Sequence, residues 1–326
     1  LFHQLSPRFL RTGNMRLPNF IIIGAAKSGT TTLYEYLCRH PQIFMSDPKE
    51  PNFFASDRNY AQGLDWYAQL FQGAKAEQMV GEASTPYTHQ LHIPDVPQRI
   101  FQTVPQVKLI YIMRHPVDRA YSLYLQQIKI FQSRHYKAKL EAFKIPETFE
   151  ELLARGNQTI DAADYMEQID VLAASNYLEI INRYLQFFSR DSCLFLLFRD
   201  LIQEPAKTVD LVCDFLEIER ATDLMQQTKI EANVSAKHKE WYLRSRLTAP
   251  LKAVPGLNRF ATLLPQEIRD GVYTLLNQLP YKKSLARAYL PEQMLPETRT
   301  ALLAKFAEPN RQLANFLQLD LSHWNY

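Results

Sequence analysis

A lysine and several hydroxyl side chains gather around two glycines near the N-terminal end of the sequence. The segment Gly24-Ala25-Ala26-Lys27-Ser28-Gly29-Thr30-Thr31-Thr32 follows an apolar run and precedes a stretch with helical spacing. Backbone N–H groups at the start of a helix, together with the helix dipole, bind phosphate or sulfate. We therefore predict an anion-binding loop here. Its expected ligands are Lys27, Ser28, Gly29, Thr30, Thr31 and Thr32.

This loop differs from the motif G-x-x-x-x-G-K-[ST] of nucleoside triphosphate enzymes. That motif has a lysine after its second glycine, whereas Thr30 follows Gly29 here, and Lys27 precedes Gly29 by two residues. A kinase also needs acidic magnesium ligands, and neither Asp200 nor Glu82 is persuasive in that role. A kinase-like P-loop nucleotide-triphosphate enzyme is therefore the alternative function.

A second polar group follows the apolar run 108–113. Arg114 comes directly after this run, Pro116 suits the first turn of a helix, and Ser122 lies about two helical turns beyond Arg114. A guanidinium offers a phosphate a planar fork of donors, and a serine hydroxyl can donate to the same group. Arg114 and Ser122 are therefore predicted to bind a second phosphate.

The elements that must position these residues alternate between strand and helix. Strands are predicted over 19–23, 79–83, 108–113 and 192–198, and helices over 33–37, 117–130, 176–188, 205–216 and 296–317. This alternation favours an α/β fold in which helices cover both faces of a parallel sheet and ligands bind at the carboxyl ends of the strands. We expect one domain over 1–326, with a core of about 18–235 and 287–326 and a helical cap inserted at about 236–286.

Composition limits the class of protein. The chain has 326 residues, of which 46% are hydrophobic and 22% charged, as in globular proteins. No apolar run approaches the roughly 18 residues of a membrane span. Three cysteines in apolar contexts favour a reducing, cytoplasmic setting, and the scattered cysteines and histidines lack the spacing of a metal site. We expect no metal.

Charge is distributed unevenly along the chain. Residues 237–290 hold ten Lys or Arg and three Asp or Glu, although the whole chain carries only +3. Such a segment attracts an anionic ligand or partner, and a solvated helical surface explains it equally well. Nucleic-acid binding is disfavoured, because the sequence pI is about 8.6 and no recognised motif appears.

The two anion-binding motifs resemble those of sulfotransferases that use 3′-phosphoadenosine 5′-phosphosulfate (PAPS). Residues 18–33 resemble the 5′-phosphosulfate loop, and the Arg-x-Pro-x-x-Arg-x-x-Ser segment for the 3′-phosphate is matched by Arg114, Pro116, Arg119 and Ser122. The likeness continues at 49–54, 81–87, 198–201 and 321–324. These pieces look more like the heparan-sulfate and bacterial branch than the animal cytosolic branch.

The resemblance implies a P-loop-like fold and PAPS as the donor, with Lys27 beside the bridging oxygen. Glu82 is our candidate for the base, since a partly desolvated carboxylate at a strand end can accept a proton. The alternative interpretation of Glu82 is an N-cap carboxylate. The family has a lysine where Ala83 stands, and Lys49 is expected to supply that cation on the substrate side.

Three other positions are compared with the family. In the stretch that contacts adenine only Ser175 and Tyr177 carry over, and Arg287 is the nearest match to the late loop that closes on the 3′-phosphate. His238, between two lysines of the basic segment, is a substrate-side residue and an alternative base if the cap covers the site. A lone surface histidine is the simpler interpretation of His238.

The acceptor is expected to be a hydroxyl. Some bacterial family members are domains of polyketide-type synthases that sulfate a β-hydroxyl of an acyl chain on an acidic carrier protein. An acyl hydroxyl on such a carrier or on a small molecule therefore comes first here, and O- or N-sulfation of a saccharide is the alternative. A non-catalytic nucleotide- or polyanion-binding module is the competing class.

Overall fold

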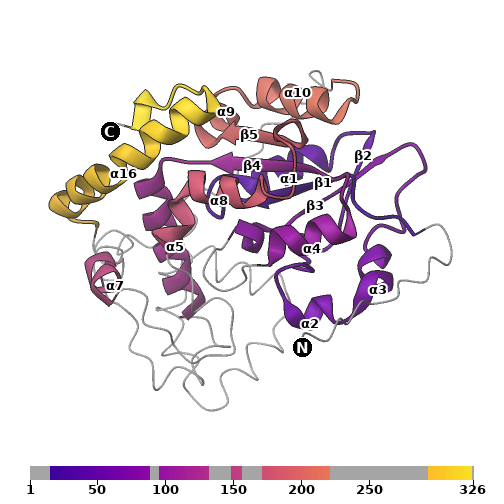
Figure 1. The fold of residues 1–326 in the computed structure, drawn as a ribbon, viewed down its shortest axis with the longest axis horizontal. Helices are drawn as coiled ribbons and strands as arrows, with labels where there is room; N and C mark the ends of the chain where they lie inside the picture. Colours follow the sequence, from indigo (N-terminus) through magenta and orange to yellow (C-terminus); the bar gives the residue numbers. More distant parts are fainter. Residues whose placement is uncertain (1–14, 89–94, 132–147, 156–170, 221–292, 325–326) are drawn as a thin grey trace, which may run out of the picture. The chain divides into compact units, whose positions relative to one another are not determined.

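The computed structural model describes residues 15–88, 95–131, 148–155, 171–220 and 293–324 (Figure 1). The chain divides into two compact units. The first comprises Leu1–Arg119, Leu172–Ile230 and Lys305–Tyr326, and the second comprises Ala120–Val171 and Glu231–Ala304. The predicted cap, which includes His238, lies outside the described residues, and so does Arg287 at the predicted return to the core.

The first unit is built on a five-stranded parallel sheet with the order β2-β3-β1-β4-β5. The strands are β1 (Phe20–Gly24), β2 (Ile43–Met45), β3 (Met79–Ala83), β4 (Lys108–Met113) and β5 (Cys193–Leu197). Their pairing confirms the predicted α/β fold with a parallel sheet.

Helices cover both faces of this sheet, because alternate strand residues point to opposite sides (Figure 1). In β1, Ile21 packs with residues of α3, α4 and α8, whereas Ile22 packs with residues of α1, α9 and α10. The helices of this unit are α1 (Thr30–Leu37), α2 (Asp57–Tyr60), α3 (Gly63–Gln69), α4 (Val96–Thr103), α8 (Tyr177–Tyr184), α9 (Phe198–Gln203) and α10 (Pro205–Leu216). Short 3₁₀ turns are η1 (Thr85–Thr88), η3 (Ala173–Ser175), η4 (Arg190–Ser192) and η5 (Ser322–Trp324).

Strand order creates a switch point between β1 and β4. The strand after β1 is β2, at one edge of the sheet, whereas the strand after β4 is β5, at the other edge. The connections that leave the neighbouring strands β1 and β4 therefore run in opposite directions. In open α/β sheets this is where ligands bind, and both predicted anion-binding motifs begin here.

Aromatic packing holds together the described part of the second unit. The described part of this unit includes most of α5 (Pro116–Phe131), α7 (Phe149–Arg155) and the first turns of α16 (Pro296–Leu317). The Phe149 ring lies 5.4 Å from both Tyr121 and Tyr124. The backbone N–H of Leu295 donates to Glu150 Oε1 over 2.9 Å.

Most predicted elements are confirmed, with differences at short elements and ends. The strand predicted over 192–198 ends at Leu197, because Phe198 begins α9. The helix predicted over 176–188 ends at Tyr184, after which the chain forms a tight turn. The three-residue strand β2 was not predicted. Among the described residues, no helix is long and apolar enough to cross a bilayer.

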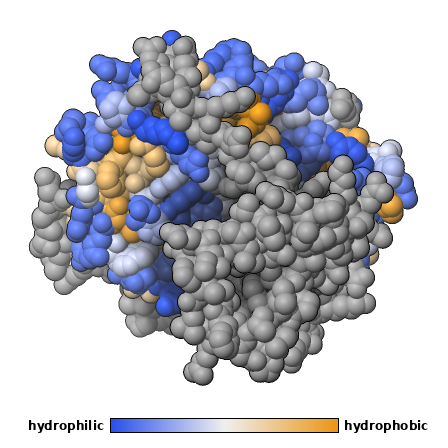
Figure 2. Space-filling view, turned by 180° about the vertical axis from the view of Figure 1, so that it is seen from behind, coloured by the Kyte–Doolittle hydropathy of each residue, from blue (hydrophilic) through white to orange (hydrophobic). Residues whose placement is uncertain are grey.

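Hydrophilic side chains cover most of the described surface seen in Figure 2, with smaller hydrophobic areas between them. The large apolar side chains that are most exposed are 39% to 50% accessible and belong to several helices or their flanks: Phe101, Ile202, Leu211, Leu295 and Phe316. Scattered exposure of this kind is normal for a globular surface.

Candidate active site

The loop after β1 turns sharply into α1. Lys27 and Gly29 both have left-handed backbone angles, with φ of 69° and 90°. At Gly29 an added Cβ would lie 2.8 Å from the ring of Phe198, so a side chain is excluded by both backbone strain and space. Gly29 caps α1 without a side-chain hydrogen bond. The first N–H groups of α1 therefore have no side-chain cap and suit an anion.

Ser28 supports this interpretation. Its side chain is fully buried, and its Oγ, which lies near the Tyr177 hydroxyl, has no hydrogen bond of good geometry in the described part of the chain. Buried hydroxyls are usually paired, since an unpaired one costs free energy. A phosphate or sulfate oxygen in the loop would satisfy the hydroxyl, so the loop fits the predicted group.

Arg114 joins the segment after β4 to this loop. Its Nη1 donates to the carbonyl oxygen of Lys27 over 3.1 Å, and its guanidinium carbon lies 4.8 Å from the centre of the Phe198 ring. Burial lowers the pKa of Arg114. The hydroxyl of Tyr177 donates to the Arg114 carbonyl over 2.6 Å and accepts from the Arg114 N–H over 3.2 Å. The structure thus brings the two predicted anion sites together.

Arg119 and Ser175 hold the start of α5 in place. Arg119 is fully buried, and its Nε donates to Ser175 Oγ over 2.8 Å. The Ser175 hydroxyl in turn donates to the Pro116 carbonyl over 3.1 Å. These bonds give Arg119 and Ser175 a positioning role. The predicted adenine contact of Ser175 and Tyr177 stays a prediction.

A cavity of about 300 Å³ opens beyond the carboxyl ends of β4 and β5. Several of its lining residues have basic side chains or aromatic rings. The lining residues are Met113, Arg114, His115, Asp118, Leu197, Phe198, Arg199, Ile202, Gln203, His323 and Trp324. A cavity with guanidinium groups beside aromatic rings suits a phosphorylated nucleoside.

Glu82 lies at the end of β3 in a closed cluster of hydroxyls. Tyr67 and Tyr87 donate to its Oε1 over 2.7 and 2.9 Å, and Ser84 donates to its Oε2 over 3.1 Å. The side chain has no exposed surface. Burial raises the pKa of Glu82 to about 7, although the three hydrogen bonds act in the opposite direction. The carboxylate therefore links α3, β3 and η1.

A second carboxylate, Glu50, lies near the same carboxyl end of β3. Its Oε1 accepts hydrogen bonds from Lys49 over 2.8 Å and from Thr85 over 3.2 Å. The Glu50 side chain is 37% exposed. Glu50 and Asn52 have φ of 61° and 52°, which is uncommon for residues other than glycine.

This strained turn is held by the end of β3. The Glu50 N–H donates to the Ala83 carbonyl over 3.0 Å, and the Asn52 N–H donates to Ser84 Oγ over 3.1 Å. Ser84 is also a donor to Glu82, so a hydrogen-bonded chain runs from Glu82 to the turn that carries Glu50. Glu50 was not among the site residues predicted from the sequence. The charged pair Lys49-Glu50 before Pro51 was the available signal.

The other predicted site residues are distributed as follows. Lys49 contacts Glu50, whose backbone N–H donates to Ala83 at the end of β3, and its substrate-side role stays a prediction. Ser122 lies on α5 and falls in the second unit, so its phosphate contact stays a prediction. In the described ranges no group of three or more His, Cys, Asp or Glu side chains is arranged to hold a metal ion.

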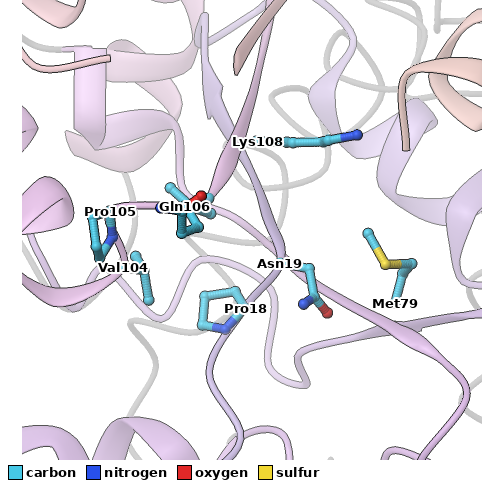
Figure 3. A pocket seen from close by; sticks show the side chains of 8 residues that line it. Pro18, Asn19, Met79, Val104, Pro105, Gln106 and Lys108 are labelled. Atoms are coloured by element: carbon cyan, nitrogen blue, oxygen red, sulfur yellow. The ribbon is translucent and has the colours of Figure 1, made fainter. Parts of the chain in front are cut away.

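A second cavity, of about 250 Å³, lies at the amino ends of β1, β3 and β4 (Figure 3). Lys108 is the one charged side chain among its lining residues, and its Nζ is engaged by Glu217 at 2.7 Å. The other lining residues are Pro18, Asn19, Met79, Val104, Pro105, Gln106 and Val107. The lining of this cavity contains no cluster of charged or hydroxyl side chains. Such clusters lie at the carboxyl ends of the strands.

The parallel sheet, the anion-binding loop and the arginine at the switch point define an α/β group-transfer enzyme. Residues 17–246 match the sulfotransferase domain family. The chain therefore belongs to that family, and it is a transferase with the fold predicted above.

Two curated relatives and one solved structure illustrate the match. Human bifunctional heparan sulfate N-deacetylase/N-sulfotransferase 3 is 30% identical over 209 residues, which are 62% of this chain and 22% of the relative. The membrane-associated sulfotransferase kil1 of Dictyostelium discoideum is 42% identical over 111 residues, 33% of this chain and 22% of kil1. The matches thus span about a fifth of these relatives. The sulfotransferase of Alicyclobacillus acidocaldarius, 24% identical, shares the fold with a TM-score of 0.58 over 95% of this chain and 100% of its own.

Proposed function

We propose that this sulfotransferase moves a sulfuryl group from PAPS to an acceptor hydroxyl. The observation that carries the proposal is the 3.1 Å hydrogen bond between Arg114 and Lys27, because it sets two anion-binding segments side by side. A donor with a 5′-phosphosulfate and a 3′-phosphate presents two anionic groups on one ribose. The loop after β1 suits the first group, and Arg114 suits the second.

The chain supplies positive charge where negative charge develops during transfer. PAPS, when bound, contributes an activated sulfuryl group with a phosphate as its leaving group. Lys27 and the first N–H groups of α1 stabilise the charge on that leaving group, since fixed donors need little reorganisation in a site that excludes water. Ser28 Oγ adds a donor inside the loop. Arg114 orients the nucleotide through its planar fork.

The proton of the acceptor hydroxyl needs a base, and two carboxylates are available. We predicted Glu82, but it is enclosed, and both its oxygens already accept hydrogen bonds from hydroxyls. Glu50 is partly exposed, and within the described residues only its Oε1 has hydrogen-bond donors. We therefore favour Glu50 Oε2 as the proton acceptor and keep Glu82 as the alternative base.

Lys49 suits a role beside this base. It contacts Glu50 Oε1 and its side chain is only 18% exposed, so its charge is held at the end of β3. We propose that this cation lies on the acceptor side of the site, next to Glu50. This is the substrate-side role that the sequence predicted for Lys49.

For the acceptor we propose a hydroxyl of an acyl chain, on an acidic carrier protein or on a small molecule. The support is the excess of basic residues over 237–290, which would attract an acidic partner. A saccharide is the second candidate, because relatives at 30% identity are named as heparan sulfate N-sulfotransferases.

A comparison of acceptors tests this function. The enzyme would be incubated with PAPS and one of three acceptors: a β-hydroxyacyl carrier protein, the same acyl group on a small thiol, or a desulfated heparan saccharide. Release of 3′-phosphoadenosine 5′-phosphate (PAP) is the readout. We expect fastest release with the carrier-bound acyl group. Fastest release with the saccharide would reverse the order of the two acceptors, and no release with any acceptor would contradict hydroxyl sulfation of these classes.

A further inference from the structure

Glu82 is a buried carboxylate that has no step in the reaction when Glu50 is the base. Its side chain has no exposed surface and accepts hydrogen bonds from the hydroxyls of Tyr67, Tyr87 and Ser84. A carboxylate is costly to bury, and such bonds offset part of that cost. Two of the three hydroxyls also contact the segment that carries Glu50, which connects the two carboxylates.

The turn over residues 49–54 is bound through side-chain hydroxyls. The Asn52 N–H donates to Ser84 Oγ over 3.1 Å, and the Phe54 N–H donates to the Tyr87 hydroxyl over 3.3 Å. In a strand pairing these N–H groups would donate to carbonyl oxygens, which are fixed in the backbone, whereas a hydroxyl rotates. The path of the turn therefore depends on the direction in which two hydroxyl groups point.

Glu82 sets the direction of both hydroxyls. A hydroxyl accepts well from an N–H only when its own hydrogen points elsewhere. Ser84 donates to Glu82 Oε2 over 3.1 Å, and Tyr87 donates to Glu82 Oε1 over 2.9 Å. Because an ionised carboxylate only accepts hydrogen bonds, it keeps the lone pairs of both hydroxyls available to the N–H groups of the turn. Hydrogen bonds linked in this way also polarise one another.

The geometry of Glu50 depends on this turn. Its φ of 61°, like the 52° of Asn52, persists only where the surroundings hold the backbone. The Glu50 N–H donates to the Ala83 carbonyl over 3.0 Å, and its Oε1 accepts from Thr85 Oγ1 over 3.2 Å. Both the backbone and the side chain of Glu50 are therefore attached to the segment that leads from β3 into η1.

Tyr67 contacts the same carboxylate without contacting the N–H groups of the turn. Its hydroxyl donates to Glu82 Oε1 over 2.7 Å, and among the described residues no backbone N–H of the turn donates to it. Its ring stacks on that of Phe53, with centroids 4.3 Å apart, as the ring of Tyr87 packs edge-on against Phe54 at 5.6 Å. The two tyrosines thus both bind Glu82 and pack on the turn, but only Tyr87 links the carboxylate to an N–H group.

We propose that Glu82 is a positioning residue, which acts through the hydroxyls of Ser84 and Tyr87 to hold the turn over 49–54 and with it the base Glu50. This role rests on the proposed function, in which Glu50 accepts the proton of the acceptor hydroxyl. Glu82 itself is enclosed and does not contact the substrate. Breaking this chain of hydrogen bonds should therefore slow the chemical step and leave donor binding unchanged.

Two phenylalanine variants test this role, since each removes one hydroxyl from Glu82 Oε1. Tyr87→Phe also removes the acceptor of the Phe54 N–H, whereas Tyr67→Phe, the matched control, does not. At about pH 8 Glu82, with its pKa of about 7, is mostly ionised. We expect Tyr87→Phe to lower kcat by about tenfold, the usual effect of one lost hydrogen bond, and Tyr67→Phe to lower it clearly less. Calorimetry should give one PAP affinity for both variants and the wild type.

Hydrogen–deuterium exchange of a peptide that covers 49–54 gives a readout independent of activity. Exchange there should be faster in Tyr87→Phe and in Glu82→Gln, because N–H groups of the turn lose an oriented acceptor, and unchanged in Tyr67→Phe. The double variant Tyr87→Phe/Glu82→Gln should have a kcat little below that of Tyr87→Phe, since both changes break one chain of hydrogen bonds.

Equal kcat values for Tyr67→Phe and Tyr87→Phe would overturn the positioning role, as would unchanged exchange in Glu82→Gln. A wild type that releases no PAP from PAPS with any acceptor would instead contradict the proposed function, so the two failures are distinguishable. Unfolding curves show which variants are folded under the assay conditions. If Tyr87→Phe is not folded, Ser84→Ala takes its place, because it removes the acceptor of the Asn52 N–H.

Discussion

Two carboxylates near the end of β3 differ in access to solvent, and the base that we propose, Glu50, was chosen on this difference. Glu50 is 37% exposed, whereas Glu82 is enclosed by three hydroxyls. We expect Glu50→Gln to lower kcat by about 100-fold or more while PAP affinity stays unchanged, because loss of a general base affects the chemical step. Single-turnover PAP release and calorimetry measure the two quantities. A larger loss of kcat in Glu82→Gln than in Glu50→Gln would return the base to Glu82.

Glu82 should also affect the pH dependence of stability. Its pKa is raised from 4.5 to about 7 in the folded protein, so between these values the folded state binds more protons than the unfolded state. The contribution of Glu82 to the free energy of unfolding therefore falls as pH rises from about 4.5 to 7, by about 3 kcal/mol. Urea denaturation of the wild type and Glu82→Gln should show this loss in the wild type only. Parallel pH profiles for the two proteins would contradict the raised pKa.

Removal of the carboxyl group should have a larger effect on folding than its replacement by an amide. Glu82→Ala leaves the buried hydroxyls of Tyr67, Tyr87 and Ser84 without their acceptor. We expect the free energy of unfolding to fall by at least about 3 kcal/mol, at about 1 to 3 kcal/mol for each unsatisfied group. Glu50→Ala is the control and should change stability little. Equal denaturation midpoints for the two alanine variants would show that the hydroxyl cluster does not stabilise the fold.

At the scale of elements, the connection between β1 and α1 requires a glycine at position 29. Gly29→Ala introduces a side chain at φ 90° and 2.8 Å from Phe198, so we expect the loop to shift and PAP affinity to fall by about tenfold or more. Gly63→Ala provides a matched control, since Gly63 has φ of 82° but no atom within 4 Å of an added Cβ. It should lower stability by about 1 kcal/mol without affecting PAP affinity. Similar PAP affinities of the two variants would contradict the role of the loop.

The elements that were predicted correctly have a clear local pattern of apolar and polar residues. Strands β1 and β4 are largely apolar, and α10 begins at a proline and buries a regular stripe. Strand β2 has only three residues, and its pairing with β3 depends on tertiary contacts that no local pattern reveals. The same limit applies to α9, whose first residue, Phe198, continues the apolar run of β5.

The binding residues were predictable where they follow soon after a strand in the sequence, as Lys27 and Arg114 do. Glu50 was missed because its left-handed turn is held by Ala83 and Ser84, which are more than thirty residues away in sequence. The burial of Glu82 was missed for a similar reason, since Tyr67 and Tyr87 reach it from α3 and η1. Position along the sequence reveals which strand a carboxylate follows but not what covers it.

At the scale of the molecule, the donor site that we propose lies in the first unit, at the switch point of the parallel sheet. The family match over 17–246 includes both anion-binding segments. Because we propose that the groups at the switch point bind the nucleotide, we also propose that residues outside these two segments recognise the acceptor. Changes in acceptor preference should therefore leave donor affinity unaltered.

The most direct test of the central claim is calorimetric binding of PAP against ATP with magnesium, in the wild type and in Arg114→Ala. We predict tight binding of PAP by the wild type, a loss of about tenfold or more in Arg114→Ala, and little binding of ATP by either protein. Preferential binding of ATP with magnesium, or PAP affinity independent of Arg114, would contradict a PAPS site between the loop after β1 and the segment after β4.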